Sequence, residues 1–379
     1  MRSLDQARAV CERYHPGLLQ ELAAIPYPER EQPGSPTIDL FRKHGGGGLL
    51  VPREYGGHGA DPLDALRVQQ AVGALSPSLA AATSMHHFTA AMLYSLAGER
   101  DRLTPEQREL LGRIAPDGLL MASGWAEGRT QQNVLVPSVT ARPTDGGYLL
   151  TGVKKPCSLS GSMDLLTASI AVPGAGGAAE LALAVIPVPS KGLSVHPFWG
   201  SDLLAGAESD EVRLTDVFVP REMVVLTSAE DPHRLADLQT AGFIWFETLI
   251  SAGYVGAAGA LVEAVVDGER GVPAERAALA LDSEAALALL EGAARALQQG
   301  LSGDDAVAGV LVARYAVQDA LPRIAARALE LLGGLDFIRS GDHAQLAASV
   351  RALAFHPPSR PASAEALLGY FGGSPLELA

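Results

Sequence analysis

The spacing of the apolar residues changes twice along the chain, and this change limits the fold more than any other feature of the sequence. Before about residue 117 the apolar residues recur at helical spacing, as at Leu4, Ala7 and Val10. From there to about 230 they form short runs and alternations bounded by turn residues, and afterwards the helical spacing returns. Strands that follow one another without intervening helices imply an antiparallel sheet or barrel. The sequence therefore predicts an α+β protein whose middle β-domain lies against a helical bundle.

Turn and capping residues divide these regions into elements. Helices are expected at 3–24, 37–43, 61–75, 78–98, from 104 onward, and at 236–268, 281–300 and 304–332. Strands are expected at 119–123, 138–142, 148–152, 165–172, 181–188 and 211–220. Asp145-Gly146-Gly147 supplies the positive backbone dihedrals of a tight turn, so the second and third strands should form a hairpin. Small residues at 252, 253, 256, 257, 259 and 260 allow another helix to approach the first C-terminal helix closely.

Charge and cysteine content exclude several classes of protein. The chain carries 29 basic and 43 acidic residues, a net charge of −14, which argues against a nucleic-acid-binding protein. Two cysteines, Cys11 and Cys157, exclude a disulfide framework or a cysteine-based zinc site and fit a reducing cytoplasm. The N-terminal stretch lacks the apolar core and cleavage site of a signal peptide. The uncharged stretch 68–98 contains Gln, Ser, Pro and His, so we expect no membrane helix.

Four short strings, in this order, resemble the acyl-CoA dehydrogenase superfamily of flavoenzymes. They are Pro52–Gly59 (PREYGGHG), Gly146–Lys154 (GGYLLTGVK), Glu211–Pro220 and Glu330–Gly334 (ELLGG). The resemblance covers almost the whole chain. It implies an N-terminal helical domain (1–116), a middle antiparallel β-barrel or sandwich domain (117–230) and a C-terminal four-helix bundle (231–379). It also implies assembly as a homodimer or homotetramer through the C-terminal helices.

The resemblance implies that two strand ends hold a flavin, FAD or possibly FMN. Ala122 and Ser123 match the first flavin strand, and Cys157 and Ser158 match the second. The two serines fall where the family places a hydroxyl that reaches the flavin, although strand ends often carry such residues as simple turns. A flavin needs a flat apolar slot with a few donors at its polar edge. Trp125 either stacks on a ring or fills a core.

The pattern departs from the family at several of these positions. Gly124 replaces the usual Glu of the motif after the first strand, and Arg129-Thr130 replaces its Ser-Asp, whereas Gly128 keeps the glycine before that pair. Pro156 stands where the second strand usually has Trp. The sequence therefore predicts a flavin pocket that is retained in outline and rebuilt in detail.

Further cofactor contacts are expected from the C-terminal domain. The family's Arg-x-x-Phe-Gly stretch, which holds the adenine end of the cofactor across a subunit interface, is shortened here and lacks the aromatic residue. Arg270 remains a candidate partner for the pyrophosphate, or else a solvated arginine at a helix end. Gly333 and Gly334 permit a close approach to the cofactor, although a helix C-cap explains them equally well.

A dehydrogenase of this family needs a carboxylate of raised pKa in a dry pocket to remove a proton from its substrate. The C-terminal region that usually supplies this Glu has none here. A minority of the family carry the base on the long helix that opens the third domain, where Glu247 lies among Trp245, Phe246 and Leu249. Glu247 is thus the candidate base, and a glutamate on a solvated helix face is the alternative.

The C-terminal string around His356 resembles the flavin monooxygenase branch of the superfamily, which includes dibenzothiophene desulfurising enzymes. There a late histidine and one from the first helical domain line the flavin pocket, and His86 or His87 would supply the second. Such histidines act on protons near neutral pH. The alternative is that all three are packed and hydrogen-bonded core residues.

The leading functional hypothesis is a cytoplasmic flavin-dependent oxidoreductase, with no metal, acting in specialised biosynthesis on an acyl thioester of coenzyme A or of a carrier protein. The alternative is a monooxygenase that uses reduced flavin and O₂ on the same fold. A third hypothesis is a non-catalytic scaffold that has lost the cofactor, which Gly124, Pro156 and the missing C-terminal Glu favour.

Overall fold

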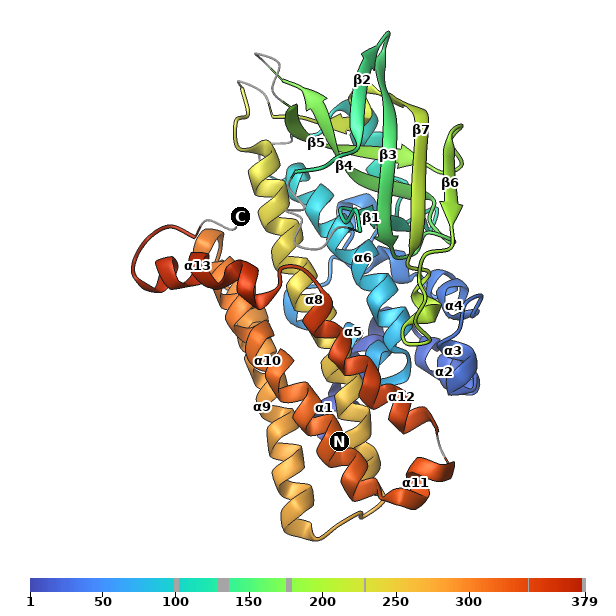
Figure 1. The fold of residues 1–379 in the computed structure, drawn as a ribbon, viewed down its shortest axis with the longest axis vertical. Helices are drawn as coiled ribbons and strands as arrows, with labels where there is room; N and C mark the ends of the chain where they lie inside the picture. Colours follow the sequence, from blue (N-terminus) through green and yellow to red (C-terminus); the bar gives the residue numbers. More distant parts are fainter. Residues whose placement is uncertain (99–101, 129–135, 175–178, 228–229, 340, 377–379) are drawn as a thin grey trace.

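The computed structural model describes residues 1–98, 102–128, 136–174, 179–227, 230–339 and 341–376 (Figure 1). Its elements follow the predicted order of helices, strands and helices. A sheet lies at one end, and a bundle of long helices extends away from it. This bears out the arrangement inferred from the apolar spacing.

The N-terminal helices pack around α5 and α6. Their bounds are α1 Arg2–Tyr14, α2 Leu18–Ala24, α3 Tyr27–Arg30, α4 Thr37–Lys43, α5 Pro62–Leu75, α6 Pro77–Tyr94 and α7 Pro105–Leu111. The prediction of one helix over 3–24 was wrong, because Gly17 adopts φ 82° and separates α1 from α2. The cap predicted at Thr104 is confirmed, since its side chain accepts from the backbone N–H of Gln107 in a capping box.

The middle strands form one mixed sheet. Their bounds are β1 Met121–Gly124, β2 Thr140–Thr144, β3 Gly147–Cys157, β4 Leu165–Pro173, β5 Ala179–Pro187, β6 Leu193–His196, β7 Asp210–Pro220 and β8 Val224–Val225. The order is β6-β7-β3-β2-β4-β5-β8, with β1 added beside β4. The predicted hairpin is confirmed, with Thr144 opposite Gly147.

Two predictions about this sheet need correction. β1 runs parallel to β4, and β2 makes a parallel pair with β4, so the sheet is not purely antiparallel. The rule used from sequence applies to consecutive strands, whereas the β2–β3 hairpin separates β1 from β4 and lets the chain return in the same direction. Among the described residues, β6 and β8 remain at opposite ends of the order, so the sheet does not close into a barrel.

The C-terminal helices build the bundle around α8. Their bounds are α8 Arg234–Asp267, α9 Pro273–Gln298, α10 Gly303–Leu332, α11 Gly334–Arg339, α12 Gly341–Ser349 and α13 Arg360–Phe371, with a 3₁₀ segment η6 at Val350–Phe355. The helix predicted at 281–300 begins earlier, because Pro273 is tolerated in the first turn. Gly333 ends α10 at φ 86°, as expected of a C-cap.

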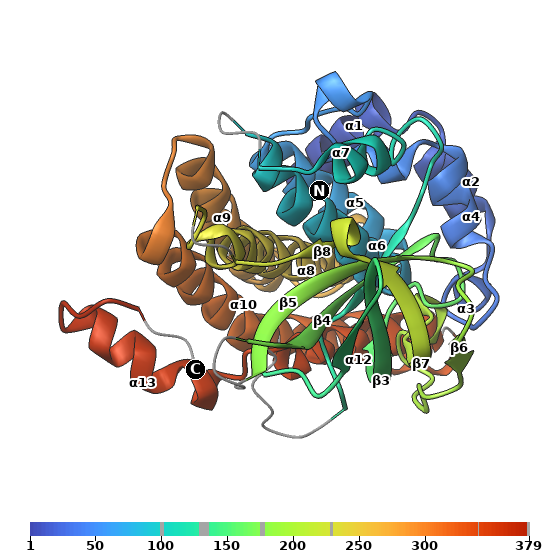
Figure 2. The same ribbon diagram turned by 90° about the horizontal axis from the view of Figure 1, so that it is seen from above.

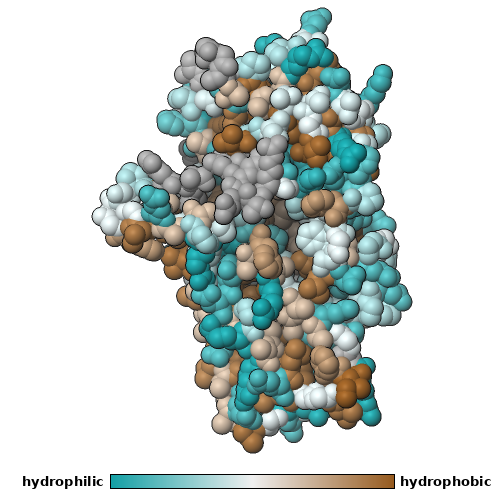
Figure 3. Space-filling view, in the orientation of Figure 1, coloured by the Kyte–Doolittle hydropathy of each residue, from teal (hydrophilic) through white to brown (hydrophobic). Residues whose placement is uncertain are grey.

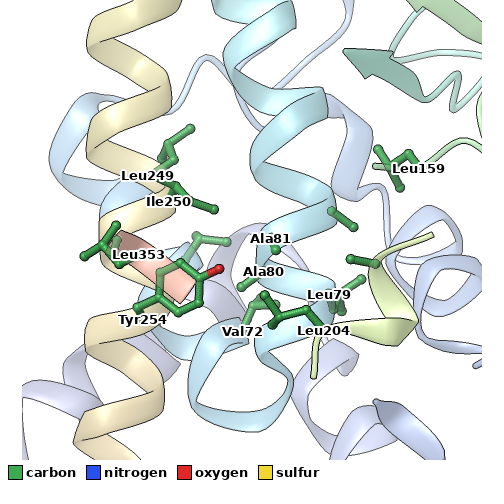
Figure 4. Close-up of a cluster of buried hydrophobic side chains, with 14 of the residues drawn as sticks. Val72, Leu79, Ala80, Ala81, Leu159, Leu204, Leu249, Ile250, Tyr254 and Leu353 are labelled. Atoms are coloured by element: carbon green, nitrogen blue, oxygen red, sulfur yellow. The ribbon is translucent and has the colours of Figure 1, made fainter. Parts of the chain in front are cut away.

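Helix α8 is the centre of the molecule. It packs against α5, α6, α9, α10 and α12, and Figure 2 shows it nearly end-on between the α9–α10 pair and the N-terminal helices. Figure 4 shows side chains of α5 and α6, such as Val72 and Ala80, meeting Ile250 and Tyr254 of α8 and Leu353 of η6. By length and apolar composition α8 could span a membrane, but 78% of its most apolar window is buried inside the protein. It is therefore a core helix.

Candidate flavin site

The two strand ends predicted to hold a flavin lie side by side. Beyond β1 the chain runs along the end of β3, where the backbone N–H of Lys155 donates to the carbonyl of Ala126 at 2.9 Å. Glu127 forms a parallel bridge with Lys155. The structure thus brings the segment from Ala122 to Gly128 next to the segment from Lys154 to Ser158.

The side chains along these two segments differ in burial and in pairing. Ala122 and Cys157 are fully buried, and burial raises the pKa of the Cys157 thiol to about 12, so it stays protonated. Ser123 is 7% exposed. The hydroxyl of Ser158 shares a hydrogen bond of 2.8 Å with that of Ser209.

The indole N–H of Trp125 is buried and has no hydrogen-bond partner in the described part of the chain. A buried donor without an acceptor lowers the free energy of unfolding by about 1–3 kcal/mol, so such donors are unusual in the core of a folded protein. A flavin edge is rich in acceptors and would meet this donor. On this observation the residues at the two strand ends fit a flavin, with Ser123, Trp125 and Ser158 as candidate contacts to its polar edge.

A buried ion pair, which sequence reasoning missed, fastens the two segments together. The ammonium of Lys154 lies 2.7 Å from the Oε1 atom of Glu127, and the two side chains are 0% and 2% exposed. Lys154 also donates to the hydroxyl of Ser169 at 2.9 Å, while Glu127 accepts from the backbone N–H groups of Ser138 and Val139. Burial lowers the pKa of Lys154, and Glu127 opposes this shift. The only sequence signal was the lysine of the Gly-x-Lys string.

Gly128 follows this pair at φ 69°, a conformation that favours glycine. The Arg129-Thr130 departure that comes next lies outside the described residues. The structure therefore places Gly128 beside Lys155 at the edge of the predicted pocket.

His86 and His87 are both fully buried on α6, but their nitrogens differ. The Nδ1 atom of His86 accepts from the backbone N–H of Met121 at 3.1 Å, and its Nε2–H donates to the carbonyl of Gly47 at 2.8 Å. Burial lowers its pKa to about 4, so His86 is neutral and joins α6 to the start of β1. Neither ring nitrogen of His87 has a hydrogen-bond partner among the described residues, and its ring packs edge-on against Phe41.

This difference predicts opposite stability effects for the same substitution. His87→Leu should raise the free energy of unfolding by about 1 kcal/mol, because it removes two unmet buried nitrogens. His86→Leu should lower it by about 2 kcal/mol, because it leaves the Gly47 carbonyl and the Met121 N–H unpaired. Urea denaturation at pH 7 measures both, and an equal loss in the two variants would contradict the assignment.

The same burial predicts a pH effect. Desolvation holds the pKa of His87 well below its ordinary value of 6.5, so the folded state stays neutral there while the unfolded state takes up a proton. The free energy of unfolding should thus fall as the pH drops below about 6.5. At pH 5.5, calorimetry in two buffers should find about one fewer proton taken up on unfolding in His87→Leu than in the wild type. An unchanged uptake would mean that His87 is already charged in the folded state.

Glu247 and Arg314 form a second buried ion pair, between α8 and α10. The Nε atom of Arg314 lies 3.0 Å from the Oε2 atom of Glu247, and both side chains are 0% exposed. Burial raises the pKa of Glu247 to about 8, while the charge of Arg314 limits the rise. Glu247 thus lies in the apolar setting expected of it, but its neighbour is an arginine that sequence reasoning did not identify.

His356 lies within a row of aromatic rings, between Tyr254 and Phe246. Its Nε2 atom is 2.9 Å from the hydroxyl of Tyr254, and its ring packs edge-on against Phe246, which in turn packs edge-on against Phe88 of α6. Burial of the ring lowers the pKa of His356 to about 3, helped by the charge of Arg314. The row links the predicted His356 to the helix that carries His86 and His87, and its other members were not predicted.

Arg270, Gly333 and Gly334 lie at the far end of the bundle from the sheet, where α8 meets α9 and α10 meets α11 (Figure 1). A Cβ atom on Gly271 would lie 2.7 Å from the Leu331 side chain, so the two turns are neighbours. The structure brings these three residues together but not to the strand ends of the same chain. The adjoining α11 exposes Leu335, Phe337 and Ile338, visible as a hydrophobic patch in Figure 3.

Other features of the described chain lie apart from this site. A cavity of about 600 Å³ is lined by N-terminal residues, among them Arg13, Arg53, His58 and Asp64, and by none of the predicted site residues. Within the described ranges, no group of three or more His, Cys, Asp or Glu side chains could hold a metal ion.

Comparison with known proteins agrees with this geometry. Residues 4–110 match the family model described as acyl-CoA dehydrogenase, N-terminal domain. The chain is 56% identical over 378 residues to isobutylamine N-hydroxylase of Streptomyces viridifaciens, and the match spans 100% of both proteins. It is 29% identical over 213 residues to dibenzothiophene monooxygenase of Rhodococcus qingshengii, which covers 55% of this chain and 49% of the relative.

The fold is also that of FMN-bound TdsC from Paenibacillus sp. A11-2, with a TM-score of 0.80, 18% identity and 99% of each chain covered. Solved structures of this fold hold FMN or FAD, and flavin is the cofactor of the family. The resemblance that the four sequence strings indicated is confirmed. The chain belongs to the acyl-CoA dehydrogenase superfamily of flavin-dependent enzymes.

Proposed function

We propose that the chain is a flavin-dependent monooxygenase that N-hydroxylates a small apolar primary amine. The full-length similarity to isobutylamine N-hydroxylase supports this choice over the acyl thioester hypothesis. The observation in the chain that carries it is the aromatic row of Phe88, Phe246, His356 and Tyr254, which packs apolar rings around a neutral imidazole. The substrate slot of this proposal lies beside that row.

The reaction would convert a primary amine and O₂ into a hydroxylamine and water. When bound, reduced flavin (FAD or FMN) would activate O₂ and supply two electrons and two protons, ending as oxidised flavin, so that one oxygen atom bonds to the amine nitrogen and the other leaves as water. Ala122, Ser123, Trp125, Cys157 and Ser158 would hold the flavin ring.

The protein's own task is to present the amine in its neutral form, because only the free nitrogen lone pair can bond to oxygen. Burial disfavours the charged form of an amine, so an aromatic slot lowers the amine pKa. His356 stays neutral at physiological pH and adds no positive charge to the slot. Tyr254, whose pKa burial raises, also stays uncharged and fixes the imidazole through its hydroxyl.

The test combines the protein with enzymatically reduced FAD or FMN, isobutylamine and ¹⁸O₂. We expect a hydroxylamine that carries one ¹⁸O atom, identified by mass spectrometry. Loss of flavin binding in Trp125→Phe, with product otherwise formed in the wild type, would support the site. Flavin oxidation without any N-hydroxylated product, across a series of short primary amines, would overturn the function, and failure to bind flavin would favour the non-catalytic scaffold.

A dehydrogenase acting on an acyl thioester of coenzyme A or a carrier protein is the second candidate. The raised pKa of Glu247 favours it, because such a carboxylate suits proton abstraction. Anaerobic mixing of the flavin-loaded protein with acyl thioesters would then bleach the flavin, and Glu247→Gln would abolish that bleaching.

We also propose a homodimer or homotetramer in the cytoplasm. The turns that carry Arg270 and Gly333-Gly334 lie at the end of the bundle opposite the sheet (Figure 1), so a partner copy would bring them to the flavin. The exposed apolar side chains of α11 suit such a contact. Light scattering would measure the mass of the assembly, and a monomer that binds flavin tightly would contradict it.

A further inference from the structure

The segment that carries His356 is a short connection without helix or strand. It leaves η6 at Phe355, passes His356, Pro357 and Pro358, and enters α13 at Arg360. Phe355 is 85% exposed, so this part of the chain gains little from apolar burial. Something else must fix the imidazole in its place.

Arg314 of α10 supplies that fixation. One of its terminal nitrogens donates to the carbonyl of Pro358 at 2.6 Å, and the other donates to the carbonyls of His356 at 2.6 Å and Leu353 at 3.0 Å. This fully buried guanidinium donates to three carbonyls, one before His356, its own and one after it. It therefore holds the backbone on both sides of the imidazole. The fixed fork of arginine donors suits this task, and a single lysine ammonium cannot reproduce it.

Glu247 completes the arrangement from the other side. Its carboxyl faces the remaining Nε atom of Arg314 at 3.0 Å, and its chain neighbour Phe246 contacts the His356 ring. Arg314 is thus enclosed by three carbonyls on one side and by the Glu247 carboxyl on the other. One turn of α8 therefore both contacts the imidazole and anchors the residue that holds its backbone.

We propose that Arg314 is a positioning residue, anchored by Glu247, that fixes His356 against Tyr254 and Phe246 for amine hydroxylation. The proposal rests on the proposed function for its catalytic consequence. It assigns Glu247 to the support of Arg314, in place of the role of base considered from the sequence. His356 is then the residue that faces the substrate, and Arg314 acts only through it.

The experiment compares Arg314→Lys with Arg360→Lys. Arg360 also holds α10, through the carbonyl of Tyr315 and the carboxylate of Asp319, but it is 45% exposed and does not touch the His356 backbone. We measure hydroxylamine formed per reduced flavin consumed. Arg314→Lys should lower this ratio about tenfold with flavin affinity unchanged, because misplacement near the reacting atoms is costly. Arg360→Lys should leave it unchanged.

A double variant separates positioning from general destabilisation. In a His356→Ala background, Arg314→Lys should cause no further loss of the ratio, because Arg314 acts through the imidazole. A further tenfold loss there would overturn the proposal. With a pKa of about 8, Glu247 is mainly protonated at pH 7, so Glu247→Gln keeps both its charge state and an oxygen beside the arginine. The ratio in this variant should stay within about threefold of the wild type. Loss of all turnover in that variant, with His356 still fixed, would instead make Glu247 the base.

A readout without turnover keeps the two proposals distinguishable. Amide hydrogen exchange over residues 350–359 should be faster in Arg314→Lys and unchanged in Arg360→Lys. If the wild type forms no hydroxylamine, the proposed function fails. Hydrogen exchange still tests the positioning role of Arg314 in that case. Unchanged exchange in Arg314→Lys would overturn the positioning role whatever the reaction is.

Discussion

Glu127→Gln is expected to lower the free energy of unfolding by about 3–5 kcal/mol. The substitution leaves the ammonium of Lys154 in the interior without its carboxylate, which lies 2.7 Å away in the wild type. Taking one partner from a buried pair costs more than the pair contributes, since the remaining ammonium is either left desolvated without its counter-charge or must give up its proton. Chemical denaturation at pH 7 measures the loss.

Two controls show whether charge burial is the cause. Adding Lys154→Met to Glu127→Gln removes the stranded charge and should restore most of the lost stability. Glu211→Gln breaks the neighbouring pair with Lys155, whose side chain is 29% exposed, so water can screen the remaining charge and the loss should be much smaller. Equal losses in Glu127→Gln and Glu211→Gln would contradict the argument.

Gly256→Ala is expected to destabilise the protein by about 3 kcal/mol, against the usual helix preference for alanine. A Cβ atom at this position of α8 would lie 2.0 Å from the carbonyl oxygen of Gln70 on α5. Both atoms belong to helix backbones, so the clash is relieved only if α5 and α8 move apart, which opens the core around them.

The same helix provides the matched comparison. Among the described residues, no atom outside its own stretch of α8 would lie within 4 Å of a Cβ atom on Gly259. Gly259→Ala should therefore stabilise the protein by up to about 1 kcal/mol through helix propensity alone. Thermal or urea denaturation of the two variants should therefore give changes of opposite sign. A gain in both would mean that α5 and α8 are not held at this close distance.

Features set by neighbouring residues were predictable from the sequence. The β2–β3 hairpin follows from Asp145-Gly146-Gly147, the α7 cap follows from Thr104 and Gln107, and the close crossing at Gly256 follows from a run of small residues. Each depends on contacts within a few residues or on one helix face. The parallel pairing of β1 with β4 was missed, because it depends on which distant strand lies next to β1.

Some residues of the candidate site were predictable from their own segment of sequence, and others were not. The apolar surroundings of Glu247 were visible in its own helix, and the structure bears out its burial. Arg314 was not predicted, because one arginine in a long amphipathic helix is usually solvated. Only the fold shows that it points inward, toward a carboxyl on α8 and three carbonyls of a distant segment.

The contacts of Arg314 with the His356 segment also bear on how enzymes of this kind can diverge. Arg314 meets only main-chain carbonyls there, so no side chain of the segment is needed for the attachment. Ala354 and Phe355, which are exposed, can therefore change by single mutations without detaching the segment. A lineage can alter the surface beside the imidazole in small steps while each intermediate keeps its fold. The two positions are accordingly a natural place to vary the surface next to His356.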